Sequence, residues 1–409
     1  MKSTYSAVEL YYYVFLFLLL LKLLLVGKSE QSYYLWYLVP KSNYINAMNK
    51  KLNLLQVYRG IAAVLVVLTH GNSILSRELN QDGLLQIFHF GWIGVDFFFV
   101  LSGFIIFYIH QYDIGKPDKL KPFIFKRFIR VYPLYWSILG IKILLSLFNN
   151  NKDNIYQRSA DEIIKAVLLI PQHRSIVESS FIGVSWTLSY EVFFYSIFAL
   201  LIFKNTKISR SIIFAWLIGI ILNLFNLLPI SKNFLLNFIF NEHNLEFVLG
   251  CLAAYTISKY KFKFATSLIY ASIFLLIVSV INTKYRDFDV SGISSLIGYG
   301  IPFMLLIIGS VYLEISKTIN VPPILIYLGN ASYSVYLTHG FFLSSASKIF
   351  TKFTEKFNIS YLIPNPILCY NVSAFLLVLI VVAMGCIIHS YLEKPLITNL
   401  RKKVFAKMN

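Results

Sequence analysis

Long apolar segments, separated by short polar connections, follow one another along the chain from residue 54 to residue 391. A transmembrane helix needs about 20 mostly apolar residues to cross the hydrocarbon layer. Ten segments approach that length: 54–70, 88–109, 131–148, 184–203, 211–229, 235–257, 264–281, 295–313, 324–349 and 367–391. The pattern therefore predicts an all-α fold, a polytopic transmembrane helix bundle with about ten core spans.

The spans are predicted to form a single domain. The sequence contains no Gly/Ser-rich or Pro-rich linker. We therefore assign residues 48–400 to one membrane domain and residues 401–409 to a basic cytoplasmic tail. Residues 149–183 hold only a short apolar stretch, and we expect them to form a partly amphipathic loop on the outer face.

The first 47 residues differ from this core. Tyr11–Val26 is apolar enough for a signal anchor or an extra N-terminal span, with Lys22 inside it. No small-residue cleavage site follows, which argues against a cleaved signal peptide. A third interpretation, which we prefer, places the natural start at Met48, because Met48 is followed by a short basic lead into the first core span.

The composition is typical of a protein in lipid. Hydrophobic residues make up 57% of the chain and charged residues 14%, with a mean hydropathy of +0.66, whereas about a quarter of an average soluble domain is charged. The net charge of +18 does not indicate nucleic-acid binding, because the basic residues fall mostly in short loops, where they orient spans toward the cytoplasm. We predict a multi-pass protein of the cell (inner or plasma) membrane with both core termini cytoplasmic.

Cysteine and metal-ligand patterns add little. The three cysteines lie in apolar segments without metal-ligand spacing, so we expect neither a disulfide framework nor a zinc site. Glu242, His243 and Glu246 supply one histidine with flanking carboxylates, which is too few ligands to predict a metal.

Ionisable residues inside spans are costly and often functional. Arg59 and His70 lie eleven residues apart in the first core span, so they share one helix face at a separation of about 16 Å along the axis. A histidine is a natural general base, because its unperturbed pKa is about 6.5. Alternatively, Arg59 extends to the interface and His70 ends the span.

Asp96, near the start of the second span, needs a partner in lipid, and Arg59 or His70 is a candidate. We therefore group Asp96 with Arg59 and His70 as catalytic candidates. Ser102, in the same span, lacks the strained turn of a nucleophilic serine, and we reject it as a nucleophile.

Arg127 and Arg130 are three residues apart at the predicted inner start of the third span, so they share a helix face. With Lys126 they form a candidate clamp for the phosphates of a cytoplasmic cofactor such as CoA. The alternative is that these residues are only a basic anchor of the kind common at cytoplasmic helix ends.

Two further spans carry polar residues. Glu191 and Tyr195 share one face of the fourth span, and Trp186 at its start is suited to stacking on a sugar ring. Glu191 either binds an acceptor, orients an imidazole or pairs with an arginine.

In the ninth span, Ser332, Tyr336 and His339 form a polar stripe that must face protein or water. His339 is a second candidate base or a hydrogen-bonded packing residue. Trp186, Glu191, Tyr195, Tyr336 and His339 are our candidates for substrate binding.

Together these segments resemble the acyltransferase-3 family of integral membrane acyltransferases, the group of bacterial polysaccharide and O-antigen O-acetylases. The resemblance covers about residues 52–400. Its motifs are Leu55-Gln-Val-Tyr-Arg59 with His70, Gly94-Val-Asp96 to Gly103, Arg127-Phe-Ile-Arg130, Ser185-Trp-Thr-Leu-Ser-Tyr-Glu191, Ser332 to His339, and Glu393-Lys-Pro395. It implies that His70 is the essential histidine, that Arg59 is its companion, and that Arg127 and Arg130 engage acyl-CoA.

The resemblance implies an O-acyltransferase that moves an acyl group, with acetyl favoured, from acyl-CoA to a hydroxyl of an envelope or exported carbohydrate. Acyl-CoA would be a co-substrate, no cofactor would stay bound, and the lipid bilayer would be the third partner. The alternative class is a transporter or flippase of a glycan or lipid-linked intermediate, in which intramembrane charges line a conduit. A non-catalytic sensor is a third possibility.

Overall fold

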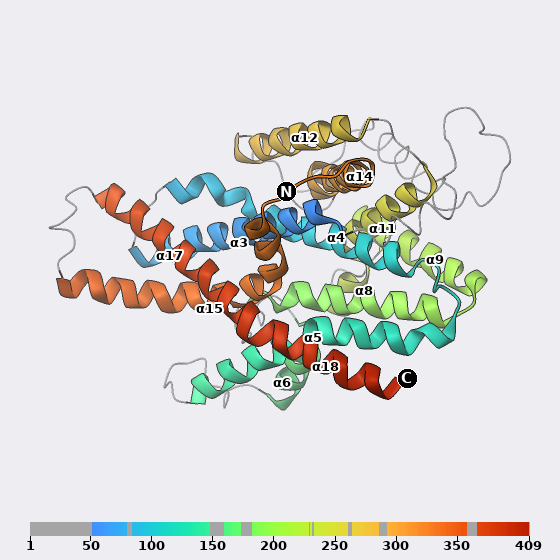
Figure 1. The fold of residues 1–409 in the computed structure, drawn as a ribbon, viewed down its shortest axis with the longest axis horizontal. Helices are drawn as coiled ribbons and strands as arrows, with labels where there is room; N and C mark the ends of the chain where they lie inside the picture. Colours follow the sequence, from blue (N-terminus) through green and yellow to red (C-terminus); the bar gives the residue numbers. More distant parts are fainter. Residues whose placement is uncertain are drawn as a thin grey trace.

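The computed structural model describes residues 51–79, 84–147, 159–172, 182–228, 230, 233–260, 264–285, 293–357 and 366–408. These parts of the chain form helices and contain no strand, which confirms the predicted all-α class (Figure 1). The expectations for residues 1–47 lie outside the described residues.

Most helices follow the predicted segments. Their bounds are α3 Asn53–Leu79, η1 Leu84–Trp92, α4 Ile93–His110, η2 Pro117–Lys119, α5 Leu120–Leu147, α6 Ala160–Leu168, α8 Ser185–Phe203, α9 Thr206–Leu224, α10 Phe234–Ile239, α11 His243–Lys259, α12 Ala265–Tyr285, α13 Ile293–Ser295, η4 Leu296–Gly300, α14 Ile301–Ser316, α15 Pro323–Phe357, α17 Pro366–Ile388, η5 His389–Glu393 and α18 Lys394–Met408. The tail predicted from residue 401 therefore continues a helix.

Eight helical stretches of the described residues are long and apolar enough to cross a membrane. The sixth predicted span is divided into two helices, because α10 ends at Ile239 and α11 begins at His243. The ninth lies within α15, whose 35 residues include the polar stripe that lowers its hydropathy. The number of crossings therefore remains a prediction.

Helix directions agree with a chain that crosses repeatedly. Gly329 of α15 meets Gln56 near the start of α3, and the His339 ring meets the His70 ring further along both helices. These two contacts make α15 parallel to α3. The first and the ninth predicted spans cross the membrane in the same direction, so they are expected to be parallel where they lie side by side.

The α3–α15 contact requires Gly329. A Cβ atom at this position would lie 1.9 Å from the carbonyl oxygen of Gln56, so Gly329→Ala must push the two backbones apart. Overpacking of this kind costs about 1–3 kcal/mol, and we expect a lower unfolding temperature in detergent. Gly140→Ala on α5 is the control, because a Cβ there meets nothing within 4 Å. Equal unfolding temperatures for the two variants would refute this account of the contact.

The start of α5 differs from the prediction. The helix begins at Leu120, because Pro117 to Lys119 form a short 3-10 turn that leads directly into it. Arg127 and Arg130 therefore lie in the second and third turns of α5 and not at its first residues, so their side chains are carried into the bundle.

The described part of the predicted outer loop is folded against α5. Ser159 caps α6 through a capping box with Glu162. The carbonyl groups at the other end of α6 accept hydrogen bonds from the Tyr132 hydroxyl, the Tyr135 hydroxyl and the Trp136 indole, at 3.0, 2.7 and 2.8 Å. Because α5 itself satisfies these carbonyls, the last turn of α6 is fixed beside the bundle.

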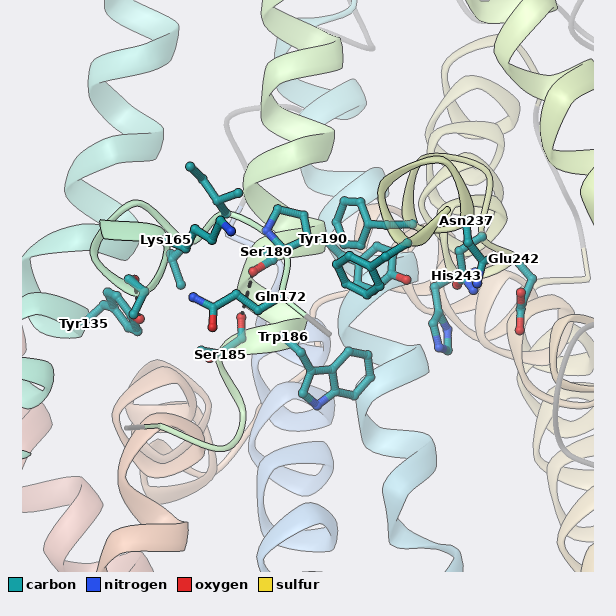
Figure 2. Close-up of a pocket in the computed structure, with 17 residues that line it drawn as sticks. Tyr135, Lys165, Gln172, Ser185, Trp186, Ser189, Tyr190, Asn237, Glu242 and His243 are labelled. Atoms are coloured by element: carbon teal, nitrogen blue, oxygen red, sulfur yellow. Dashed lines mark hydrogen bonds between the residues drawn. The ribbon is translucent and has the colours of Figure 1, made fainter. Parts of the chain in front are cut away.

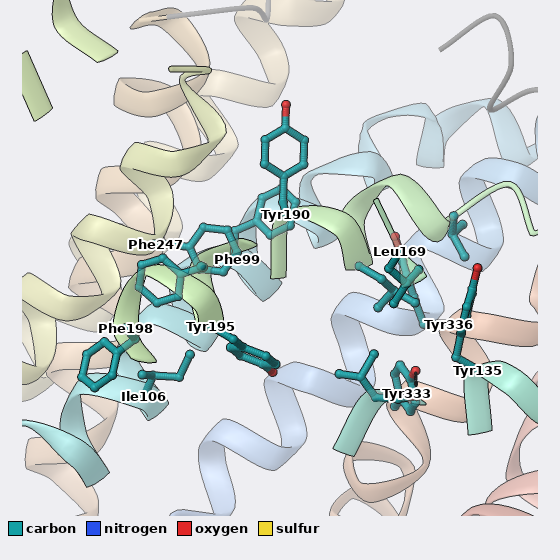
Figure 3. Packing of buried hydrophobic residues seen from close by; sticks show 14 of the residues in the cluster. Phe99, Ile106, Tyr135, Leu169, Tyr190, Tyr195, Phe198, Phe247, Tyr333 and Tyr336 are labelled. Atoms are coloured by element: carbon teal, nitrogen blue, oxygen red, sulfur yellow. Dashed lines mark hydrogen bonds between the residues drawn. The ribbon is translucent and has the colours of Figure 1, made fainter. Parts of the chain in front are cut away.

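Aromatic side chains fill the space between α4, α8 and α11 (Figure 3). The Phe247 ring stacks on Phe194 with centroids 4.4 Å apart and lies 4.9 Å from the Phe99 ring. Large rings with few rotatable bonds hold neighbouring side chains in fixed positions. This cluster therefore fixes the geometry around the polar groups described next.

Candidate active site

A cavity of about 310 Å³, named here the arginine cavity, lies between α3, α4, α5, α8 and α15. Its lining includes Arg59, Arg127, Arg130, Glu191, Tyr195 and Tyr336. Predicted site residues from four separate helices therefore meet in one cavity, which carries more cationic than anionic groups.

Arg130 is the arginine whose charge is directly neutralised. It forms a salt bridge of 3.0 Å with Glu393, and its guanidinium lies 5.0 Å from the centre of the Tyr333 ring. Glu393 also accepts a hydrogen bond of 2.7 Å from the Ser334 hydroxyl and lies 2.7 Å from Nδ1 of His389. The phosphate-clamp hypothesis grouped Arg130 with Arg127 and Lys126, and the structure pairs the Arg130 guanidinium with Glu393.

Glu393 is a site residue that the sequence argument missed. It was noted only as the first residue of the Glu393-Lys-Pro395 motif. The signal in the sequence was an acidic residue directly after the last apolar segment. In the structure, the side chain of Glu393 is only 1% exposed. A buried carboxylate at a helix end demands a cationic partner.

Arg59 and Arg127 keep their charges available. Nη1 of Arg59 donates to Gln56 at 2.9 Å. The Arg127 guanidinium lies over the Phe123 and Tyr195 rings, 5.5 and 5.6 Å from their centres. Within the described residues, neither arginine forms a salt bridge with a carboxylate.

Lys126, the third member of the predicted clamp, is exposed on the surface of α5 and does not line the arginine cavity. Its direction follows from helix geometry, because adjacent residues point about 100° apart. Arg59 and Arg127 therefore line the arginine cavity, and Lys126 does not.

Glu191 lies in the same cavity. Its carboxylate accepts a short hydrogen bond from the Tyr195 hydroxyl and lies 3.5 Å from the Ser102 hydroxyl. The prediction that Glu191 and Tyr195 share a helix face is confirmed. Glu191 does not contact an imidazole among the described residues, so the hypothesis that it orients a histidine has no support.

A second cavity, of about 400 Å³, is named here the histidine cavity, and its lining includes His70, Lys142, Trp186 and His339. The two imidazole rings lie edge to face with centroids 4.8 Å apart. Nδ1 of His70 lies 3.0 Å from the carbonyl oxygen of Val66. A carbonyl only accepts, so Nδ1 is the donor, and in the neutral form of this imidazole the lone pair lies on Nε2.

His339 repeats this arrangement. Its Nδ1 lies 2.5 Å from the carbonyl oxygen of Tyr336, and its buried Nε2 has no hydrogen-bond partner within the described part of the chain. An Nε2 lone pair can accept a proton, so two such imidazoles make this cavity suited to general-base chemistry. Lys142, which the sequence argument left without a role, adds a cation to the same lining.

Tyr336 separates the two cavities. Its ring lines the arginine cavity and lies 5.8 Å from the His339 ring, which lines the histidine cavity. Its hydroxyl is 2.9 Å from the Thr187 hydroxyl. The predicted stripe of Ser332, Tyr336 and His339 is therefore a continuous polar edge that extends from one cavity to the other.

Asp96 lies in a different cluster from the expected one. Asp96, His243 and Glu246 offer ligand atoms within 4.8 Å of one another, and within the described residues they are the group with the spacing to hold a metal ion. Gly94 faces α3, and a residue two positions later points about 200° away. Asp96 therefore faces α11 instead of Arg59 or His70.

A third cavity, of about 350 Å³, is named here the amide cavity, because Gln172, Asn237 and Asn241 contribute to its lining. Trp186 lines both this cavity and the histidine cavity. Figure 2 shows the Trp186 indole between Gln172 and His243. The position of Trp186 thus connects the amide cavity with the two histidines.

The helical bundle and its adjoining polar cavities define a multi-pass membrane protein with an interior reaction or binding site. The family described as acyltransferase domain, acyltransferase-3, matches residues 52–393. The chain belongs to this family and is a membrane acyltransferase.

Two curated relatives agree with this assignment. The chain is 27% identical over 279 residues to the exopolysaccharide production protein ExoZ of Rhizobium meliloti, an alignment that covers 64% of this chain and 79% of the relative. It is 26% identical over 274 residues to the protein of Acidianus two-tailed virus that is named "Putative acetyltransferase ORF330", with 62% of this chain and 74% of the relative covered. No solved structure gives a significant match.

Proposed function

We propose that the protein transfers an acyl group, with acetyl favoured, from acyl-CoA to a hydroxyl group of an envelope or exported carbohydrate. The observation that carries the proposal is the pair of adjoining cavities, one with two available arginines and one with two histidines. The relative named for exopolysaccharide production supports a carbohydrate acceptor.

The arginine cavity is the donor side. Guanidinium groups bind phosphate through charge-assisted hydrogen bonds, and Arg59 and Arg127 are free to make them. The basic segment from Lys116 to Lys126 precedes Arg127, which supports a cytoplasmic entrance for acyl-CoA.

The histidine cavity is the site of transfer. Nε2 of His70 takes the proton of the acceptor hydroxyl as the oxygen forms a bond to the thioester carbonyl carbon. The carbon–sulfur bond then breaks, and the CoA thiolate leaves with that proton. In the alternative route, Nε2 of His70 first attacks the thioester carbon, and the carbon–sulfur bond breaks to release the CoA thiolate. The acceptor hydroxyl then attacks the acyl carbon, the carbon–nitrogen bond breaks to restore the imidazole, and the hydroxyl proton passes to the thiolate.

The positions of the cations support different tasks for them. Arg59 lines the arginine cavity, whereas His70 lines the histidine cavity. Lys142 lines the histidine cavity and supplies the cation there. We therefore assign Arg59 to donor binding and Lys142 to the reaction centre.

Arg127→Ala is expected to raise KM for acetyl-CoA about tenfold or more with a smaller effect on kcat. A hydrogen bond to a charged group contributes roughly 1.5–3 kcal/mol, and about 1.4 kcal/mol corresponds to a factor of ten. Steady-state kinetics in detergent or nanodiscs provides the measurement. Lys126→Ala is the matched control, since this neighbouring cation is exposed. Equal KM values for the two variants would contradict the assignment of Arg127.

The function itself is tested by mass spectrometry of envelope glycans from cells with the intact gene, a deletion, and the deletion complemented with His70→Ala. We expect an O-acyl mass increment only with the intact gene, and its mass identifies the acyl group. Identical glycans in all three strains would refute the carbohydrate acceptor and favour the transporter class.

A further inference from the structure

The amide cavity has preoriented hydrogen-bond donors. The side-chain oxygen of Asn241 accepts a hydrogen bond of 3.0 Å from the backbone N–H of His243. A backbone N–H only donates, so this contact fixes which end of the amide is oxygen. The NH₂ group of Asn241 therefore points away from the bond and remains a donor.

The orientation of the Asn237 amide is also fixed by a hydrogen bond. Nδ2 of Asn223 donates to the backbone oxygen of Phe240 at 3.0 Å and to Oδ1 of Asn237 at 3.2 Å. Since the Phe240 oxygen only accepts, the Asn223 atom is nitrogen and the Asn237 atom that meets it is oxygen. Both asparagines thus keep an NH₂ group for a ligand oxygen.

Aromatic rings form another part of the lining. Trp186, Tyr190 and Phe238 line the cavity, and the Tyr190 and Phe238 rings stack with centroids 4.1 Å apart. The Trp186 ring lies 5.8 Å from the His243 ring (Figure 2). Flat rings beside amide donors match the two chemical faces of a sugar, whose C–H groups pack on an aromatic ring while its hydroxyls accept hydrogen bonds.

The charge of the cavity favours an uncharged ligand. Lys165 lines it, but its ammonium group is 2.5 Å from the carboxylate of Asp161. Glu242 adds a carboxylate to the lining. A uronate or other anionic sugar would bring a further negative charge beside the Glu242 carboxylate.

We propose that the amide cavity binds a neutral sugar unit of the acceptor glycan and presents its hydroxyl past Trp186 to His70. The inference rests on the proposed function and adds the place and charge class of the acceptor. The wall shared by the amide and histidine cavities at Trp186 supports it.

The test measures binding and transfer separately in the full-length protein in nanodiscs. The probes are neutral glucan oligosaccharides and oligogalacturonates, with acetyl-CoA as donor. Asn237→Asp and Asn241→Asp keep the oxygen that accepts the local hydrogen bond and remove the NH₂ donor, so we expect the fold to be retained. Asn399→Ala, exposed on α18, is the control.

We expect the neutral oligosaccharide to bind, and each aspartate variant to weaken binding and raise the acceptor KM about tenfold, with the acetyl-CoA KM unchanged. Unchanged sugar binding in the variants, tighter binding of oligogalacturonate, or no sugar binding to the wild-type protein would overturn the inference. If both variants transfer the acyl group with an unaltered acceptor KM, the placement of the acceptor in the amide cavity is refuted but the proposed function is not. Sugar binding that the variants weaken, without acyl transfer by the wild type, would instead refute the proposed function.

Discussion

His70→Ala is expected to lower kcat for O-acyl transfer by about 10²- to 10⁴-fold, the usual contribution of a positioned general base. Loss of activity would be complete if His70 carries the acyl group. The physical reason is the Nδ1 contact with Val66, which holds Nε2 ready to accept a proton in the histidine cavity. Single-turnover assays with labelled acetyl-CoA measure the effect.

The His70 experiment has two controls. His89→Ala replaces an exposed histidine of η1 and should leave kcat within a factor of two. The KM for acetyl-CoA should also stay close to wild type in His70→Ala, because the donor phosphates are assigned to the separate arginine cavity. Rapid acyl transfer by His70→Ala would exclude both the general-base and the acyl-histidine route.

Glu393→Ala is expected to destabilise the protein by up to about 3–5 kcal/mol, since it leaves the partly buried guanidinium of Arg130 without its partner. The side chain is 1% exposed, and its carboxylate is engaged by Arg130, Ser334 and His389. Its removal breaks the links from η5, which joins α17 to α18, to Arg130 of α5 and Ser334 of α15. Thermal unfolding in detergent, with recovery of monodisperse protein, provides the measurement.

The double variant Arg130→Met/Glu393→Ala separates pairing from general damage. It removes both charges, so it should unfold at a higher temperature than Glu393→Ala alone. Asp118→Ala, an acidic residue with a 69% exposed side chain, should change stability by less than about 0.5 kcal/mol. A double variant as unstable as the single one would show that the ion pair is not the cause.

Residues on one helix were predicted well. The shared faces of Glu191 with Tyr195 and of Ser332, Tyr336 and His339 follow from the helical repeat, and the structure confirms both. These features depend on local spacing, which the sequence contains directly.

Partners on different helices were predicted poorly. Arg130 and Glu393 are 263 residues apart in the chain, and the sequence offered no reason to join them. Asp96 was assigned to Arg59 or His70 because all three are ionisable, but the rotation of α4 turns it to His243 and Glu246. Equally, Lys126 was included in the clamp by adjacency, although its side chain is directed to the surface.

The sequence by itself determined the helical membrane fold and the polar residues that need partners inside it, because apolar length and helical period are local properties. The tertiary structure decided which polar groups meet: those of the arginine cavity, those of the histidine cavity beyond Tyr336, and those of the amide cavity beyond Trp186. The reason is geometric, since a span fixes only the height and direction of a side chain, while helix rotation and neighbouring helices choose its partner.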